Sequence, residues 1–167
     1  MNREILNGPL EVGLRVLAVL SSAFPQAFDI ASLAYFDYTL LHSSEFGGPE
    51  SINPDVPNHR TEMAIKRDLI EHGLEVMIRA QLVKVCVNES GIGYAATENG
   101  PGFVNLLESE YMHALKDRAS WVISEFGDID VEGLTDAVGR VVNWADDPAV
   151  GGSEAPSPRQ GGNAWGP

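Results

Sequence analysis

The chain has 167 residues, of which 44% are apolar, and its 24 acidic residues outnumber its 11 basic residues to give a formal net charge of −13. This length fits one domain, or one domain with a helical extension, and the apolar fraction is sufficient for a hydrophobic core. The acidic balance disfavours nonspecific binding of nucleic acid, because contacts to phosphate groups require Lys and Arg. Net charge is a global quantity, however, so a local basic patch has to be sought residue by residue.

The single cysteine and the apolar runs bear on the location of the protein. Cys86 cannot form an internal disulfide and is expected to be a buried, reduced thiol, which fits a reducing cytosol. The longest apolar run, Leu14 to Ala23, contains Arg15 and is too short to cross a bilayer. The first residues lack the basic-then-apolar pattern of a secretory signal. These features predict a cytoplasmic protein without a membrane-spanning segment.

Two helices are predicted before residue 43. Leu10 to Phe24 is apolar almost all the way round, which is typical of a helix buried centrally or at a subunit interface, and Pro25 ends it. Asp29 is a suitable N-cap for a second helix, Ile30 to Leu41.

The next segment, residues 43–60, is predicted to be irregular. It contains three prolines and a Gly-Gly pair, which exclude a regular element. Most connections between elements span only about four to six residues, so this loop is unusually long. It is either a functional loop or a solvated insertion, and the sequence leaves both interpretations open.

A long helix and a β-hairpin follow, and they are the most informative part of the sequence. Helical spacing of apolar residues predicts a helix over Thr61 to Ala80. The β-branched run Leu82 to Val87 predicts a strand, Asn88 to Gly91 a turn in which Gly91 takes a positive φ, and Ile92 to Ala96 the return strand. A helix followed by such a hairpin is the second half of a winged helix-turn-helix.

Further helices are predicted after Pro101, which is expected to break the chain. They comprise a short helix over Phe103 to Leu107, a long amphipathic helix from about Tyr111 to Phe126, and a final helix capped by Asp130. The sequence thus predicts a winged helix-turn-helix domain over residues 1–100 with the long 43–60 loop, a helical extension over residues 101–145, and a disordered Gly- and Pro-rich tail over residues 146–167. The fold class is mainly α with a small β-hairpin.

No group of residues predicts an enzyme. The four histidines are scattered, cysteine pairs for zinc are absent from the sequence, and no glycine-rich loop ends in Gly-Lys-Ser or Gly-Lys-Thr. No serine has a neighbouring base that would activate it. We therefore expect neither catalysis nor a bound metal or cofactor.

DNA binding is weighed on the long helix and the hairpin. The candidate contacts are Lys66, Arg67, Arg79 and Lys84, with Arg60 beside them. They are opposed by four carboxylates on the same helix and by Glu89 at the hairpin tip. A winged helix that binds phosphate groups normally has an excess of Lys and Arg on this face. The balanced charge favours a solvated or protein-binding face over a DNA-binding face.

Three stretches of the first 60 residues resemble the small middle component of bacterial ABC-three-component systems. They are Asn7-Gly-Pro-Leu-Glu-Val-Gly-Leu-Arg15 with Ala23-Phe24-Pro25, then Leu33-Ala-Tyr-Phe-Asp-Tyr-Thr-Leu-Leu-His42-Ser, then Gly47-Gly-Pro-Glu-Ser-Ile-Asn-Pro-Asp-Val-Pro with Arg60. The likeness extends over residues 7 to about 127. The chain is also similar in style to the acidic winged-helix subunits of condensin-like machines, which dimerise and bind other proteins.

The resemblance implies a winged-helix protein without enzymatic activity. Such a component is encoded with a Rad50-like ABC ATPase and an effector, in systems implicated in defence against phage and other mobile elements. It also implies that a small group of residues makes structural or partner contacts, namely Arg15, His42, Gly48, Pro49 and Arg60.

We therefore expect a non-catalytic adaptor that links the ABC ATPase to the effector subunit of the same operon. We expect a homodimer formed through the apolar first or fifth helix. The alternative function is a winged-helix DNA-binding transcription regulator, and an enzyme of unrecognised type ranks third.

Overall fold

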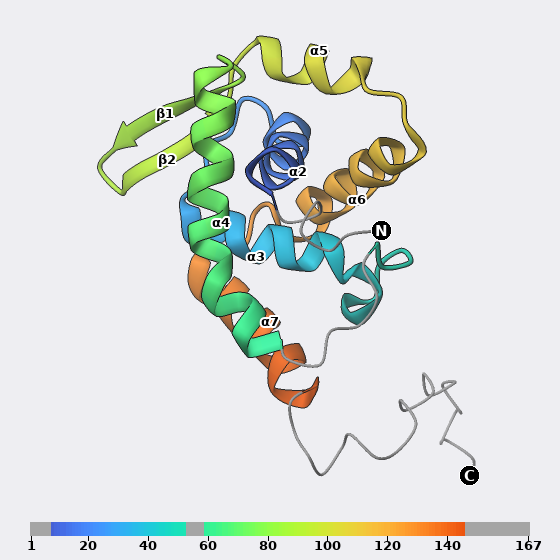
Figure 1. Ribbon diagram of the computed structural model, residues 1–167. Coiled ribbons are helices and arrows are strands. Elements are labelled where there is room, and N and C mark those ends of the chain that lie inside the picture. The colour runs from blue at the N-terminus through green and yellow to red at the C-terminus, as the bar shows by residue number, and fades with distance from the viewer. Residues whose placement is uncertain (1–7, 53–58, 146–167) are drawn as a thin grey trace, which may run out of the picture.

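The computed structural model describes residues 8–52 and 59–145, which form seven helical segments and one β-hairpin in those ranges (Figure 1). The elements, in chain order, are α2 (Pro9–Ser22), α3 (Ile30–Leu41), the 3-10 helix η1 (Ser43–Phe46), α4 (His59–Arg79), β1 (Val83–Asn88), β2 (Gly91–Ala96), α5 (Asn99–Leu106), α6 (Glu110–Phe126) and α7 (Val131–Ala145). The predicted class, mainly α with a small β-hairpin, is confirmed.

Local signals set several of these boundaries. The Asp29 side chain accepts a hydrogen bond from the Ser32 N–H at 2.7 Å, so α3 begins where the sequence predicts. Asp130 caps α7 in the same way through the Gly133 N–H at 2.8 Å. Ser109 caps α6 by accepting from Met112, a cap that the sequence analysis did not identify.

Three sequence predictions about local structure need correction. The segment after residue 42 is not wholly irregular, because η1 forms before the Gly-Gly pair, and α4 begins at His59 instead of Thr61. Pro101 does not break the chain, because it lies in the first turn of α5, where its missing N–H has no helical partner to lose. Residues 53–58 and the predicted tail over 146–167 lie outside the described residues.

The hairpin has the predicted turn. β1 and β2 pair antiparallel from Val83 opposite Ala96 to Asn88 opposite Gly91. The Asn88 side chain accepts a hydrogen bond from the Ser90 N–H at 2.9 Å, and Gly91 has a φ of +117°. Phe28 extends the sheet at one point, because its backbone exchanges two hydrogen bonds with Tyr94.

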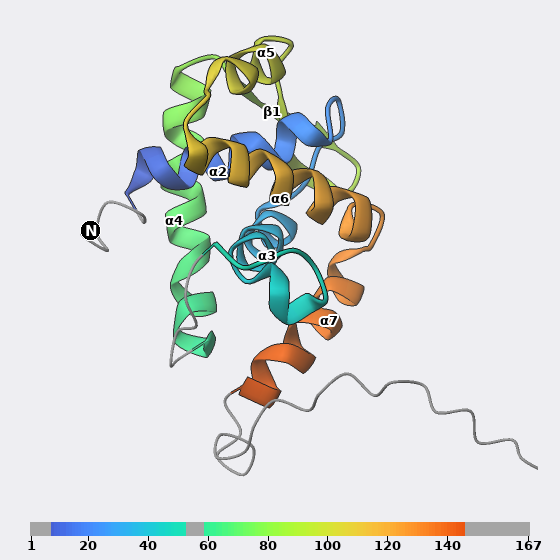
Figure 2. The same ribbon diagram turned by 90° about the vertical axis from the view of Figure 1, so that its right-hand side faces the viewer.

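Helix α2 is the centre of the molecule. It lies between α4 and α6 and above α3, and the two views in Figures 1 and 2 agree on this arrangement. Eight of its residues are buried, including Val12, Val16, Leu17 and Leu20. The sequence predicted either a central position or a subunit interface for this helix, and the structure shows the central position.

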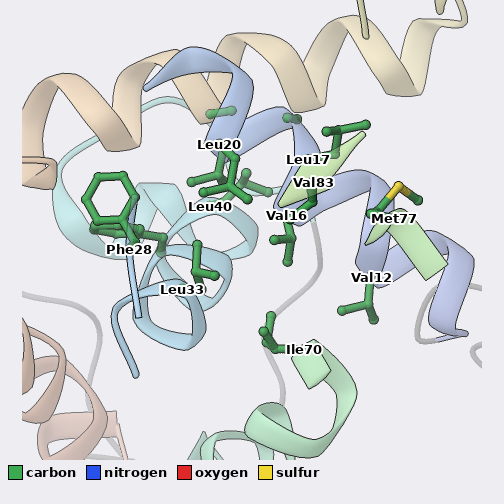
Figure 3. Close-up of a cluster of buried hydrophobic side chains, with 14 of the residues drawn as sticks. Val12, Val16, Leu17, Leu20, Phe28, Leu33, Leu40, Ile70, Met77 and Val83 are labelled. Carbon is green, nitrogen blue, oxygen red and sulfur yellow. The ribbon is translucent and has the colours of Figure 1, made fainter. Parts of the chain in front are cut away.

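The hydrophobic core is continuous across the predicted boundary at residue 100. Side chains of α2, α3, α4 and β1 form one side of it (Figure 3). Met112, Leu115, Ala119 and Val122 of α6 and Leu134 of α7 belong to the same buried cluster. The apolar face of α6 is therefore used inside the chain, and the helices after residue 100 share a core with those before it.

Candidate functional site

A cluster of three charged side chains is buried between α2, α3 and α4. Asp37 binds Arg15 through two hydrogen bonds, Nε to Oδ1 at 2.7 Å and Nη2 to Oδ2 at 3.2 Å. Its Oδ2 also accepts from Lys66 Nζ at 2.6 Å. The three side chains are only 1–3% exposed. Because they come from three different helices, the cluster fixes how these helices pack.

The electrostatics of this cluster suit a structural role. Burial raises the pKa of Asp37, but the charges of Arg15 and Lys66 and their hydrogen bonds outweigh it, so the pKa lies well below its ordinary value. Burial alone would lower the pKa of Arg15, and the charge of Asp37 reverses that effect and raises it. Asp37 therefore stays ionised near neutral pH, where it binds both Arg15 and Lys66.

Tyr111 of α6 lies at the edge of this cluster. Burial is the largest influence on its hydroxyl group and raises the pKa, while the nearby charge of Arg15 acts in the opposite direction. Neither Tyr111 nor Asp37 was predicted from the sequence as a site residue. The available signal was the pair of opposite charges, Arg15 and Asp37, each flanked by apolar residues in a mainly apolar helix.

Residues 43–52 form an ordered loop, although the sequence left a solvated insertion open. The Ser43 hydroxyl donates to the carbonyl oxygens of Pro49 at 2.8 Å and Glu50 at 3.3 Å. The hydroxyls of Ser44 and Ser51 lie 2.6 Å apart. These hydrogen bonds tie the two ends of the loop together across the Gly-Gly turn.

The same loop is attached to α6. Arg118 Nε donates to the Glu50 carbonyl oxygen at 2.9 Å. Gly48 lies against the indole ring of Trp121 so closely that a Cβ atom at this position would overlap the ring. Gly48 and Pro49 therefore make structural contacts within the chain.

Substitution of Gly48 by alanine tests this packing. The added methyl group has to displace the Trp121 ring, so we expect the free energy of unfolding to fall by about 1 kcal/mol. Gly102→Ala is the matched control, because a Cβ atom there has nothing within 4 Å. Urea denaturation followed by circular dichroism measures both variants. Equal stability of the two variants would contradict the close contact.

His42 lies inside the chain with 0% exposure. Its ring centroid is 4.6 Å from that of Tyr38, and Tyr38 in turn meets Phe46, which meets Phe126 of α6, each at 6.1 Å. This row of rings connects α3, η1 and α6. In the structure His42 makes an internal contact, as Arg15, Gly48 and Pro49 do, while the side chain of Arg60 lies outside the described residues.

The candidate DNA contacts do not form one basic surface. Lys66, a candidate DNA contact from the sequence, is buried with 3% exposure and binds Asp37, so it does not face solvent. Arg67 and Arg79 are exposed near opposite ends of the described face of α4, and Lys84 is exposed on β1.

Carboxylates outnumber cations on the exposed face of α4. Among its residues with described side chains, Asp68, Glu71 and Glu75 are exposed beside the two arginines. Glu89 is exposed in the hairpin turn. Because Lys66 is buried, this face has fewer exposed cations than a count of Lys and Arg in the sequence indicates, and it is therefore more acidic.

The hairpin exposes apolar side chains that the sequence analysis did not identify as a surface. Val85, Val87 and Ile92 are 50%, 78% and 59% exposed. Cys86, between the two valines, is partly exposed and is not the buried thiol that the sequence predicted. The hairpin projects away from the helices (Figure 1). No other described element covers its outer half.

The described residues contain no cluster of three or more His, Cys, Asp or Glu side chains suited to hold a metal ion. In the same part of the chain, no helix has the length and apolar character needed to cross a membrane.

Together these features define a mainly helical protein with a small β-hairpin and a structural charge cluster at its centre. The chain belongs to the family ABC-three component (ABC-3C) system Middle Component 2, whose model matches residues 5–146. This match confirms the resemblance carried by the first 60 residues and makes the protein a component of a multi-subunit system, distinct from its ATPase. No curated protein and no solved structure matches the chain.

Proposed function

We propose that this protein is a non-catalytic adaptor that links a Rad50-like ABC ATPase to the effector subunit of an anti-phage or mobile-element defence complex. The proposal includes a winged-helix architecture for α2 to β2, a cytoplasmic location and a homodimer. Because the apolar faces of α2 and α6 pack inside the chain, such a dimer would use another surface. The family supports a role within a multi-subunit assembly. The adaptor role goes beyond the family description and rests on the charge of the face formed by α4 and the hairpin.

The charge of the face formed by α4 and the hairpin carries this proposal. In a winged helix this face is the one that normally contacts DNA. Here the described side chains that are exposed on α4 include more carboxylates than cations, and the hairpin tip exposes apolar residues. Such a face is repelled by phosphate groups and suits a protein surface.

Co-purification of the protein with the other subunits encoded in its operon tests the adaptor role. We expect the tagged protein to elute with the ABC ATPase and the effector. If it elutes alone and instead retards its own promoter DNA in a salt-sensitive way, the adaptor proposal fails.

The alternative, a transcription regulator, is favoured only by the order of helices and hairpin and by the exposed Arg67 and Arg79. The charge reversal Lys84→Glu on the hairpin distinguishes the regulator from the adaptor. We expect any retention on DNA to change by less than about twofold, whereas a loss of a phosphate contact in a true wing weakens binding to all sequences. A large loss of retention would therefore favour the regulator.

A further inference from the structure

A groove lies in the angle between α4 and the hairpin. Its walls are Glu71, Leu74, Glu75 and Ile78 of α4 and Tyr94 of β2, and its volume is about 180 Å³. The four α4 residues are spaced three and four apart, so they share one face of the helix. Leu74, Ile78 and Tyr94 supply the apolar part of the lining, and both charged residues in it are carboxylates.

The groove opens onto the exposed apolar side of the hairpin. In the β1–β2 register, Val85 lies opposite Tyr94 and Val87 lies opposite Ile92. Because side chains alternate along a strand, these four residues share one face of the hairpin, and Lys84 lies on the other. We call this surface, the lining together with Val85, Val87 and Ile92, the α4–hairpin groove.

We propose that the α4–hairpin groove binds a basic polypeptide segment with apolar side chains, supplied by another subunit of the ABC-3C system. This inference rests on the proposed function and names the surface and the chemistry of the partner. An apolar side chain of the segment lies on the partly exposed Ile78 and Tyr94, and its Lys or Arg residues pair with Glu71 and Glu75. The volume is below the roughly 300 Å³ at which small-molecule sites begin, and it suits a protein side chain.

Charge complementarity favours a basic segment over a second copy of this chain and over nucleic acid. A second copy of the chain carries a formal charge of −13, so like charges oppose its approach to an acidic groove. Nucleic acid is opposed by the same carboxylates and finds no cation among the residues of the lining. A basic segment neutralises both glutamates and covers the apolar hairpin face.

Binding of the co-expressed ATPase and effector subunits to groove variants tests the proposal. Val87→Glu places a charge on the apolar side, and Leu106→Glu is its control, because Leu106 is also 78% exposed but lies at the end of α5, away from the hairpin (Figure 1). We expect Val87→Glu to weaken binding about tenfold or more and Leu106→Glu to change it less than about twofold. Both positions are exposed, so the fold is retained, as thermal unfolding of each variant verifies.

The carboxylates are tested by charge reversal. The double variant Glu71→Lys/Glu75→Lys should weaken binding about tenfold and abolish its dependence on salt. Glu125→Lys/Glu132→Lys makes the same change of net charge at exposed residues of α6 and α7 and should have little effect. If the wild-type protein binds neither subunit, the adaptor proposal fails together with this inference. If it binds and both groove variants bind equally well, only the groove is wrong.

Photo-crosslinking from position 87 identifies the occupant. With p-benzoylphenylalanine in place of Val87, mass spectrometry of the crosslinked complex should find a peptide of a partner subunit that contains Lys or Arg beside apolar residues. Crosslinks to an acidic peptide, to a second copy of this chain or to nuclease-sensitive nucleic acid would each overturn the proposal.

Discussion

Asp37→Asn should lower the free energy of unfolding by about 3–5 kcal/mol. Asparagine has nearly the same shape, so the main change is the loss of the negative charge. Arg15 and Lys66 then remain buried, at 1% and 3% exposure, without the carboxylate that both bind. Urea denaturation followed by circular dichroism gives the free energy of unfolding.

An exposed ion pair supplies the control. Asp117 and Arg118 are 2.7 Å apart, but the Asp117 side chain is 67% exposed, so Asp117→Asn should cost less than about 1 kcal/mol. Replacing the whole cluster, as Arg15→Met/Asp37→Leu/Lys66→Met, should restore most of the stability, because no buried charge is then left unbalanced. A cost for Asp37→Asn no larger than that for Asp117→Asn would show that the cluster does not hold the three helices together.

The pH dependence provides a second measurement of the same effect. The pKa of Asp37 is lower in the folded chain than its ordinary value of 3.8. Below about that pH the unfolded chain binds a proton that the folded chain does not, so the free energy of unfolding falls as the pH falls toward the folded pKa. The stability of the wild-type protein should therefore approach that of Asp37→Asn below about pH 4, and a constant difference between them would contradict the assignment.

Gly73→Ala should lower the free energy of unfolding by about 1–3 kcal/mol. α2 and α4 cross where Gly13 faces Gly73, and a Cβ atom on Gly73 would lie 2.7 Å from the Gly13 backbone nitrogen. Backbone atoms cannot rotate away, so the added methyl group has to separate the two helices. The opposing gain in helix propensity from Gly to Ala is only about 1 kcal/mol.

Gly139→Ala is the matched control for this crossing. Gly139 lies inside α7, and a Cβ atom there has nothing within 4 Å. This substitution should raise the free energy of unfolding by about 0.5–1 kcal/mol through helix propensity alone. If Gly73→Ala also stabilises the protein, the close approach of α2 and α4 is not required for the fold.

The sequence was sufficient where the structure depends on neighbouring residues. The cap at Asp29, the limits of Ile30 to Leu41 and the turn at Gly91 are set by hydrogen bonds and backbone preferences within a few positions. The first 60 residues also carried the resemblance to the family that matches residues 5–146. Prediction was weaker at residues 43–60, where η1 depends on contacts between Ser43 and the carbonyl groups of residues 49 and 50.

The candidate site was only partly predictable, because its pairs are distant in the sequence. Arg15 and Lys66 are 22 and 29 residues from Asp37, and no local pattern states that they meet. Counting Lys66 among the surface cations made the face of α4 look balanced in charge. Its burial changes that balance, and this is the main reason for preferring a protein partner over DNA.

The sequence by itself determined the helices, the hairpin, the acidic character and the family of this protein. Only the tertiary structure decided which charges are inside, that α2 is the central helix, and that the apolar side of the hairpin is left exposed next to two glutamates. The physical reason is that secondary structure follows from short-range backbone and side-chain preferences, whereas burial and charge pairing depend on helices that meet across the fold.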